Sequence, residues 1–485
     1  MNIHTIFARK RYAQAVAGGA IALSAAGIVL LRAEVSQRPV VETESINVTP
    51  GTATQAPRAE FRGPAAHGSV ALSQGAIATA GMQHVFAEVR ITADQVANAA
   101  IRPVAMAVVL DVSGSMSGEK LEQAKRSVLQ LVERMRDTDQ IALVTYSDSA
   151  RVIQPLAPLS VARAALQMTI PTIAIEGGTN IPAGLGMGAM ALGNAAQGFV
   201  RRIVLVSDGQ DTSGRPLEQV RAEVRGRADA GFTVSTLGIG VDYSEPTMTA
   251  LADAGRGNYE FLRTGAELAS FLTRELDQAN RTTVERATAE VTLPAGWRLD
   301  RAVGTEAQGT SGTLVLPVGA LFAGDERRIV LDLVAPASAA GAVHSLAVRA
   351  NWHAVQSNQD VRVGDGQLAI RATDSQAEVV ASVNAEVMAQ SQSALLAVRQ
   401  REAVEAWRSG DAQRAQAITA SNIVALRALQ ANAPSAAPAL ARQAAAYADE
   451  SESFGNVSAG SAEGRAQSLG FNARHRRAAM RSAAY

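Results

Sequence analysis

Apolar residues in the middle third of the chain form short continuous runs that alternate with runs of helical spacing. Ala107–Leu110 and Ile203–Val206 are uninterrupted apolar runs, typical of strands covered on both faces of a parallel sheet. Lys120–Met135 places its apolar residues three and four positions apart, which predicts an amphipathic helix. The same patterns predict strands at 140–146, 149–155, 233–240 and 258–262, and helices at 159–169, 181–196, 216–230, 245–254 and 266–280. This alternation predicts an α/β fold with a doubly wound, mostly parallel sheet over residues 100–281.

The segments on either side of this unit alternate between apolar and polar residues, as strands do. Residues 286–372 contain several such runs, separated by Pro, Gly and Asp at the intervals of a β-sandwich. Residues 67–99 show the same alternation, so we interpret them as strands that join this adjoining sandwich. Residues 374–450 are rich in alanine with helical spacing and predict a C-terminal helical segment. Residues 451–485 are rich in Gly, Ser and Ala with a late cluster of basic residues, which predicts a disordered basic tail.

The first 32 residues have the pattern of a membrane anchor. Arg9, Lys10 and Arg11 precede Ala13–Leu31, an apolar run that can just cross a bilayer at 1.5 Å per residue. The basic flank is expected to stay in the cytoplasm, which places the rest of a single-pass protein outside it. A cleaved signal peptide, giving a secreted or periplasmic protein, is the alternative. Residues 33–66 are rich in Pro, Thr, Glu and Gln and predict a flexible linker.

Composition excludes several classes of function. The chain has 45 Lys and Arg against 45 Asp and Glu, so no overall basic field favours nucleic acid as a partner. It contains no cysteine, which excludes disulfides, thiolate metal sites and a cysteine nucleophile.

Oxygen-bearing side chains lie at the ends of two predicted strands and on one loop. Asp111, Ser113 and Ser115 are spaced two apart where the first strand ends, Thr179 follows two glycines before a predicted helix, and Asp208 ends the strand at 203–207. In open α/β sheets, ligands bind at this carboxyl edge where the strand order reverses. Carboxylates and hydroxyls, with no thiol or imidazole nearby, suit a hard cation such as Mg²⁺. The sequence therefore predicts a metal site at this edge.

This combination resembles the von Willebrand factor type A domain and its metal-ion-dependent adhesion site, over roughly residues 100–280. The Asp-x-Ser-x-Ser triplet, the threonine of Gly-Gly-Thr and the aspartate of Ser-Asp-Gly all match. The resemblance implies Mg²⁺, or Mn²⁺ or Ca²⁺, as the ion. It also implies that Ser113, Ser115 and often Thr179 bind the ion directly, while Asp111 and Asp208 act mostly through water. Because neutral hydroxyls leave the ion with positive charge, we expect it to capture an acidic side chain of a protein ligand.

Enzymatic alternatives lack their motifs. A serine hydrolase needs Gly-x-Ser-x-Gly, but Gly114-Ser-Met-Ser-Gly118 places methionine at the centre. The six histidines form no His-Glu-x-x-His pair, so a zinc protease has no ligands. Gly184-Leu-Gly-Met-Gly188 lies within a predicted helix without a lysine, so we interpret it as close helix packing rather than a phosphate loop.

We therefore expect no enzyme. The sequence predicts an extracytoplasmic adhesion or scaffold protein that binds a protein ligand in a cation-dependent way. The alternative is an assembly factor that partners a ring ATPase, as the type A subunits of chelatases do.

Overall fold

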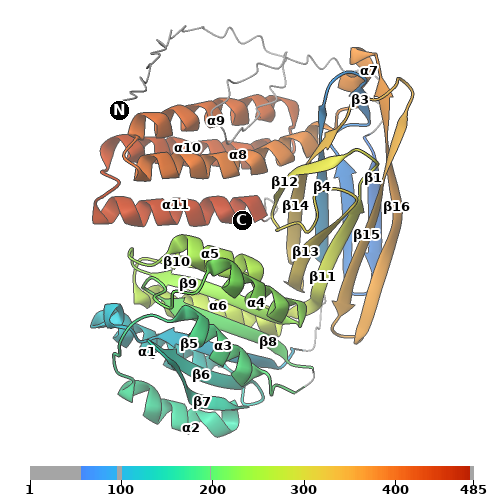
Figure 1. Cartoon of the computed structure of the whole chain (residues 1–485). Coiled ribbons are helices and arrows are strands. Elements are labelled where there is room, and N and C mark those ends of the chain that lie inside the picture. Colours follow the sequence, from blue (N-terminus) through green and yellow to red (C-terminus); the bar gives the residue numbers. More distant parts are fainter. Residues whose placement is uncertain (1–55, 96–100, 197, 481–485) are drawn as a thin grey trace, which may run out of the picture.

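The computed structural model of the chain describes residues 56–95, 101–196 and 198–480. The predicted anchor at 1–32 and most of the predicted linker, residues 33–55, lie outside the described residues. Within the described ranges, none of the helices combines the length and apolarity needed to cross a membrane. The described chain forms a three-layered α/β unit, a β-sandwich and a layer of helices (Figure 1).

A six-stranded sheet forms the centre of the α/β unit, in the order β10-β9-β8-β5-β6-β7. Its strands are β5 (Val104–Asp111), β6 (Gln140–Tyr146), β7 (Ala150–Pro158), β8 (Val200–Ser207), β9 (Phe232–Ile239) and β10 (Arg256–Leu262). Neighbouring strands run parallel except β6 and β7, which form an antiparallel pair at one edge. The chain leaves β5 toward β6 on one side and returns to β8 on the other. The strand order therefore reverses at β5, and the predicted doubly wound fold is confirmed.

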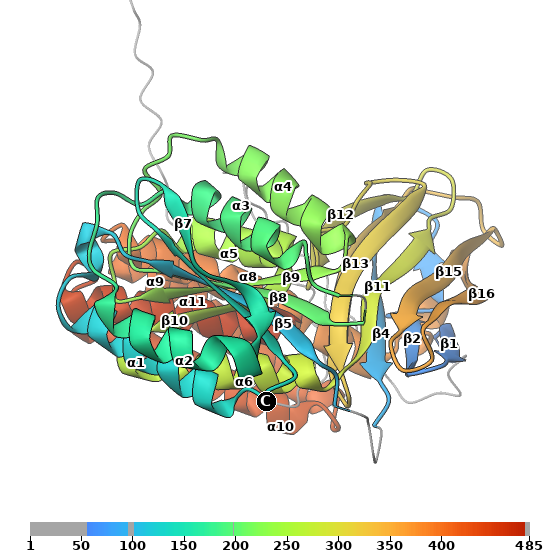
Figure 2. The same cartoon turned by 90° about the horizontal axis from the view of Figure 1, so that it is seen from below.

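Helices cover both faces of this sheet (Figure 2). The helices are α1 (Glu119–Arg134), α2 (Leu159–Thr169), α3 (Ile181–Leu192), α4 (Leu217–Asp229), α5 (Glu245–Ala254) and α6 (Leu268–Asn280), with short 3₁₀ turns at Gly114–Met116, Ile170–Thr172 and Gly265–Glu267. Val108 and Leu110 of β5 belong to the apolar core with α1, α2 and α6. Ala107 and Val109 belong to the opposite core with α3, α4 and α5. The continuous apolar run of β5 thus serves two cores at once, because successive side chains of a strand point to opposite faces.

Two five-stranded sheets pack into the sandwich, with strand orders β1-β2-β4-β14-β12 and β13-β11-β15-β16-β3. Before the α/β unit come β1 (Arg58–Gly63), β2 (Ala66–Leu72), β3 (Ala76–Ala78) and β4 (Gln83–Ala93). After it come β11 (Thr282–Thr292), β12 (Arg298–Val303), β13 (Thr313–Phe322), β14 (Glu326–Ala335), β15 (Val343–Ala354) and β16 (Gln359–Thr373). β4 pairs with β14 along its length, so the α/β unit is inserted into the sandwich between β4 and β11.

The prediction of a flexible linker up to residue 66 is wrong for Arg58–Gly63, which form β1. This strand lies at the edge of its sheet and alternates between exposed and half-buried residues. It is held by backbone pairing with β2, from Arg58 opposite Ala71 to Gly63 opposite Ala66. Because such an edge strand buries few of its side chains, its composition resembles that of a linker.

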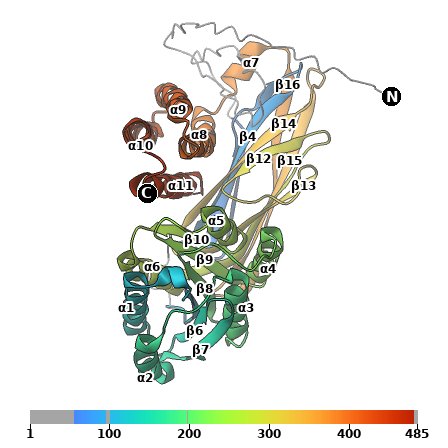
Figure 3. The same cartoon turned by 60° about the vertical axis from the view of Figure 1, so that its left-hand side comes forward.

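The C-terminal segment consists of α7 (Gln376–Ala381), α8 (Ala385–Arg408), α9 (Ala412–Asn432), α10 (Ala437–Asn456) and α11 (Ala462–Met480). α8, α9 and α10 lie side by side, and α11 lies between them and β10 of the α/β unit (Figures 1 and 3). Leu469 and Ala473 of α11 pack into the core shared by α3, α4 and α5. Met388 of α8 packs against Phe86 of β4, so the helical layer touches both the sandwich and the α/β unit.

The prediction of a disordered tail at 451–485 is wrong for residues 451–480, which complete α10 and form α11. Its basic residues find partners far away in the sequence. His475 is buried against Glu450 of α10, and Arg476 pairs with Asp253 of α5. These partners neutralise the charge that made the segment look solvated, and they cannot be recognised from local composition.

Candidate metal centre

Asp111, the last residue of β5, has a side chain with no exposed surface and is held by three donors. Its Oδ1 accepts a hydrogen bond from the backbone N–H of Ser113 at 2.8 Å. Its Oδ2 accepts from Ser207 Oγ at 2.8 Å and from the Tyr146 hydroxyl at 3.3 Å. Burial raises the pKa of Asp111, while the hydrogen bonds from Ser113 and Ser207 act in the opposite direction. The donors fix the orientation of this carboxylate at the sheet edge.

Ser113 directly precedes the 3₁₀ turn that follows β5, and Ser115 lies within this turn. Ser113 is buried and Ser115 is exposed, and their Oγ atoms are 3.1 Å apart. Ser115 Oγ donates to Oδ1 of Asp208 at 2.7 Å. Met116, between Ser115 and Ser117, is fully buried and anchors the turn to the core. The triplet thus presents hydroxyl oxygens toward the end of β8.

The Gly-Gly-Thr loop is tied to this turn by its backbone. The N–H of Gly114 donates to the carbonyl oxygen of Gly177 at 3.1 Å. A Cβ at Gly177 would lie 1.7 Å from Oδ2 of Asp148, and one at Gly178 would lie 2.6 Å from its Oδ1. Both positions therefore need glycine, because the Asp148 carboxylate lies directly against the loop. This contact places Thr179 at the sheet edge.

The hydroxyls of Thr179 and Ser115 both lie close to Gly209, around the space that a side chain at this position would fill. A Cβ at Gly209 would lie 3.0 Å from Thr179 Oγ1 and 3.3 Å from Ser115 Oγ. The N–H of Thr179 is held by Thr212 Oγ1 at 3.0 Å, and Thr179 is 5% exposed. Glycine at 209 keeps the space between the two hydroxyls free.

The structure thus brings the five predicted residues to one edge of the sheet, at the carboxyl ends of the neighbouring strands β5 and β8. Ser113, Ser115 and Asp208 are linked by hydrogen bonds, and Thr179 borders the same space. In the part of the chain that the structure describes, no group of three or more His, Asp or Glu residues is placed to hold a metal. The donors at this edge are two buried carboxylates with three hydroxyls, a set that fits a hard divalent cation such as Mg²⁺.

Sequence reasoning missed Lys120, in the first turn of α1. Its ammonium group contacts Asp208 Oδ2 and donates to the carbonyl oxygen of Ser115 at 3.3 Å. It also missed Tyr146 and Asp148, which support Asp111 and the glycine loop. Lys120 lies five residues after Ser115, where the predicted helix begins. This position is the sequence signal that could have placed Lys120 near the site.

Comparisons with known proteins agree with this architecture. A model of the von Willebrand factor type A domain family matches residues 106–274. The protein YfbK of Escherichia coli K12 is 33% identical over 196 residues, which cover 39% of this chain and 33% of that protein. Inter-alpha-trypsin inhibitor heavy chain H4 of Bos taurus is 30% identical over 154 residues, which cover 30% of this chain and 17% of that protein. The chain thus spans a third or less of the length of these two relatives.

A solved structure resembles most of the chain. The von Willebrand factor type A protein from Catenulispora acidiphila has a TM-score of 0.60 at 18% identity, covering 81% of this chain and 91% of that one. At this identity the likeness concerns the fold alone. The family match and the fold agree on the central unit, and domains of this family typically bind a divalent metal. Residues 106–274 are therefore a von Willebrand factor type A domain.

Proposed function

We propose that the protein binds another protein through a divalent cation, Mg²⁺ or Mn²⁺, held by Asp111, Ser113, Ser115, Thr179 and Asp208. The observation that carries this proposal is the arrangement of the hydroxyls. Ser115 is exposed at the rim, and its Oγ is tied to the buried carboxylate of Asp208. Because Ser115 is exposed, a cation held here would be open to a further ligand from outside.

The hydroxyl-bearing and carboxylate residues of the proposed site have different roles. The hydroxyl oxygens of Ser113, Ser115 and Thr179 would contact the cation, and the carboxylates of Asp111 and Asp208 would orient these groups and balance its charge. A bound cation supplies the positive charge that attracts a carboxylate of the partner. No residue of the site is assigned to bond breaking, and no nucleic acid is assigned as a partner. The proposed function is binding.

The proposal is tested by cation binding to the full-length protein and two serine variants. Ser115→Ala removes a proposed ligand, whereas Ser117→Ala removes an exposed hydroxyl two positions along the same loop. We expect Ser115→Ala to weaken Mg²⁺ or Mn²⁺ binding by about tenfold or more in calorimetry. Ser117→Ala should bind as the unchanged protein does. No heat of cation binding, or an equal effect of both variants, contradicts the proposal.

Partner capture is tested with the same variants. Pull-downs from membrane extracts with full-length protein should recover a partner in Mg²⁺ and lose it in chelator. Ser115→Ala should lose the partner in both conditions, and Ser117→Ala should behave as the unchanged protein. A partner that stays bound in chelator contradicts a role for the cation in binding.

We also propose that the domain lies outside the cytoplasm, either anchored by residues 1–32 or exported after their removal. Protease protection in intact and permeabilised cells tests the side of the membrane, and sequencing the N-terminus of the mature chain tests cleavage. If residues 33–485 are protected within the cytoplasm, the ring-ATPase assembly factor becomes the better proposal.

A further inference from the structure

A cavity of about 690 Å³ lies where the type A domain, the sandwich and the helical layer meet. β10 and α6 form one wall, β14 of the sandwich a second, and α8, α10 and α11 the rest. Cavities of 300 to 1,000 Å³ between domains are typical of small-molecule sites. This cavity is remote from the sheet edge that carries Asp111, because its residues on the type A domain come from the edge strand β10 and from α6.

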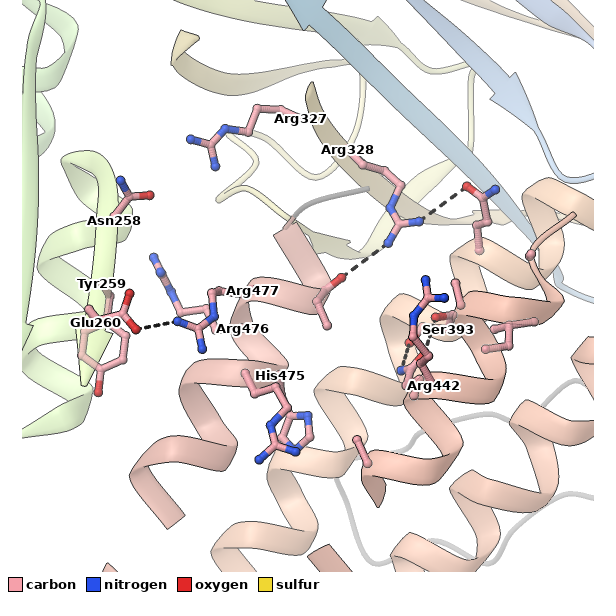
Figure 4. Close-up of a pocket in the computed structure, with 18 of the residues that line it drawn as sticks. Asn258, Tyr259, Glu260, Arg327, Arg328, Ser393, Arg442, His475, Arg476 and Arg477 are labelled. Carbon is pink, nitrogen blue, oxygen red and sulfur yellow. Dashed lines mark hydrogen bonds and ion pairs between the residues drawn. The ribbon is translucent and has the colours of Figure 1, made fainter. Parts of the chain in front are cut away.

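The lining of this cavity is strongly basic, and we call it the arginine cavity. Seven arginines and His475 line it, against three glutamates. Arg327 and Arg328 come from β14, Arg442 from α10, and Arg476 and Arg477 from α11 (Figure 4). The basic residues thus converge from separate elements of the fold.

The three glutamates do not balance this charge. Glu275 is 1% exposed and already binds Arg202, which lies outside the cavity, at 2.6 Å. Glu260 is shared between Arg477 at 2.6 Å and Arg274 at 3.2 Å. The third, Glu386, accepts a hydrogen bond from Gln390 at 2.8 Å. Two cations therefore depend on one carboxylate of the cavity, while Arg476 and Arg327 pair with Asp253 and Asp325 outside it.

Two arginines of the helical layer are available to an incoming anion. Arg442 is exposed at the cavity and forms no hydrogen bond or ion pair with another residue of the described ranges. The nearest carboxylate to Arg474 is Glu450, at 3.6 Å through Oε1. The other oxygen of Glu450 is held by His475 and Gln400, so Arg474 shares this carboxylate with two other groups and approaches it only beyond hydrogen-bond distance.

Arg328 adds a cation that is removed from water. Its side chain donates to Gln390 Oε1 at 3.5 Å and to the carbonyl oxygen of Ala478 at 3.4 Å, and the residue is 6% exposed. Burial lowers the pKa of Arg328, because a desolvated guanidinium is less favourable than a hydrated one. An oxyanion in the cavity would offset this desolvation.

The remaining wall is apolar and built of small residues. Ala439 and Ala446 of α10 line the cavity beside Leu440 and the preceding Ala436, and Tyr259 of β10 lines it as well. These short side chains leave space for the body of a ligand, while the arginines surround its charged groups. A ligand that matches both features is small, multiply anionic and organic.

We propose that the arginine cavity binds a small organic polyanion whose phosphate or carboxylate oxygens contact Arg328, Arg442, Arg474 and Arg477. Guanidinium groups are planar and donate in pairs, which matches the paired oxygens of both anion types. Because the cavity is lined by all three parts of the chain, the bound anion fastens α11 to the type A domain and to β14. This site is separate from the proposed cation site and does not depend on it.

The test uses full-length protein dialysed free of divalent cations, with pyrophosphate and citrate as probes in calorimetry and thermal unfolding. NaCl at matched ionic strength is the reference for non-specific screening. Arg442→Gln should weaken probe binding at least fivefold, and Arg442→Gln with Arg474→Gln at least twentyfold. Arg427→Gln, which removes an exposed arginine of α9 outside the cavity, should leave binding unchanged, and so should Ser115→Ala.

The two probes separate the sources of the anion. Binding of pyrophosphate alone assigns a phosphorylated ligand, and binding of citrate alone assigns a polycarboxylate; either result supports the site. The proposal is overturned if neither probe acts beyond matched NaCl, or if Arg427→Gln weakens binding as much as Arg442→Gln. Binding of an acidic peptide but of neither small probe also overturns it, because the site would then be a protein-docking surface.

Discussion

The ammonium group of Lys120 contacts one oxygen of the Asp208 carboxylate, and Ser115 Oγ donates to the other oxygen at 2.7 Å. Asp208 has no exposed surface, so Lys120 is the cation that balances a buried charge. The same carboxylate belongs to the proposed cation site. Lys120 and a divalent cation bound at the proposed site would therefore compete for Asp208.

Lys120→Met is expected to strengthen Mn²⁺ binding by about tenfold or more, equivalent to ~1.4 kcal/mol. The substitution removes a positive charge that repels the incoming cation and occupies Asp208. Lys125→Met is the matched control, because Lys125 lies on the same helix and pairs with Glu122 at 2.8 Å. Calorimetry of both variants gives the comparison. If Lys120→Met weakens Mn²⁺ binding, Lys120 supports the site rather than competing with the cation.

Gly209→Ala is expected to weaken cation binding by about tenfold while the domain stays folded. The new Cβ would lie 3.0 Å from Thr179 Oγ1 and 3.3 Å from Ser115 Oγ, which narrows the space between the two hydroxyls. Gly226→Ala in α4, where an added Cβ meets open space, controls for the loss of glycine. Mn²⁺ titration and thermal unfolding separate affinity from stability. Unchanged affinity in Gly209→Ala would place the cation away from this space.

The three glycines of α3 should respond in opposite directions to alanine. A Cβ at Gly188 would lie 2.6 Å from Val109 Cγ2, so Gly188→Ala should destabilise by about 1–3 kcal/mol through overpacking. At Gly184 the Cβ would meet the Tyr146 ring at 2.8 Å, with the same expected direction. Gly186 faces open space, so Gly186→Ala should stabilise by about 0.5–1 kcal/mol. Urea unfolding measures all three, and a uniform response would contradict the close packing of α3 on β5 and β6.

The sequence predicts the central sheet and the place of the candidate site because both depend on local signals. The apolar runs of β5 and β8 require burial on both faces, and side chains that follow such strands must lie at one sheet edge. Asp111 and Asp208 are therefore located by the position of their strands alone. The spacing of the glycines in α3 predicts close helix packing, and the approach of Gly188 to Val109 and of Gly184 to Tyr146 agrees with this prediction.

The features that sequence reasoning missed depend on partners far away in the chain. Lys120 meets Asp208 only after the sheet has formed. The strand β1 is defined by backbone pairing rather than by buried side chains. α11 looks like a solvated tail until Glu450 and Asp253 are placed beside its basic residues. These contacts cannot be predicted from local composition, because each one joins two segments that are far apart in the sequence.

His475→Ala is expected to destabilise the protein by about 2–4 kcal/mol and to loosen α11. His475 Nε2 lies 2.8 Å from Glu450 Oε2, and both residues are at most 1% exposed. Removing the ring leaves a buried carboxylate with the Gln400 amide as a donor at 3.0 Å. Urea unfolding should show the loss, and limited proteolysis should cut between α10 and α11. His475→Gln keeps a donor and should recover part of the stability, whereas wild-type behaviour of His475→Ala would contradict a structural role for this contact.

Glu245→Gln is expected to change how stability depends on pH. Glu245, the first residue of α5, is 6% exposed, and its Oε2 accepts from Arg408 at 3.0 Å and from Asn472 at 3.2 Å. Burial nevertheless raises the pKa of Glu245 above its ordinary value of 4.5. Between 4.5 and the raised pKa the folded protein binds more protons at this group than the unfolded chain does, so the free energy of unfolding falls as pH rises through this window.

Glutamine at this position carries no titrating proton, so its contribution does not change with pH. The unfolding temperature of Glu245→Gln should therefore rise relative to that of the unchanged protein as the pH increases from about 4.5 to 7. The pH-dependent contributions of all other groups are the same in both proteins, so they cancel when the two unfolding temperatures are subtracted. Glu223→Gln is the control of opposite sign, because the hydrogen bond from Arg215 lowers the pKa of Glu223. The stability due to Glu223 is present above its unfolded pKa and is lost as pH falls through the folded pKa. The difference for Glu223→Gln should therefore fall with rising pH below about 4.5 and stay flat above it, whereas the difference for Glu245→Gln should rise above 4.5. A flat Glu245→Gln curve between pH 4.5 and 7 would contradict the unfavourable burial of the Glu245 charge.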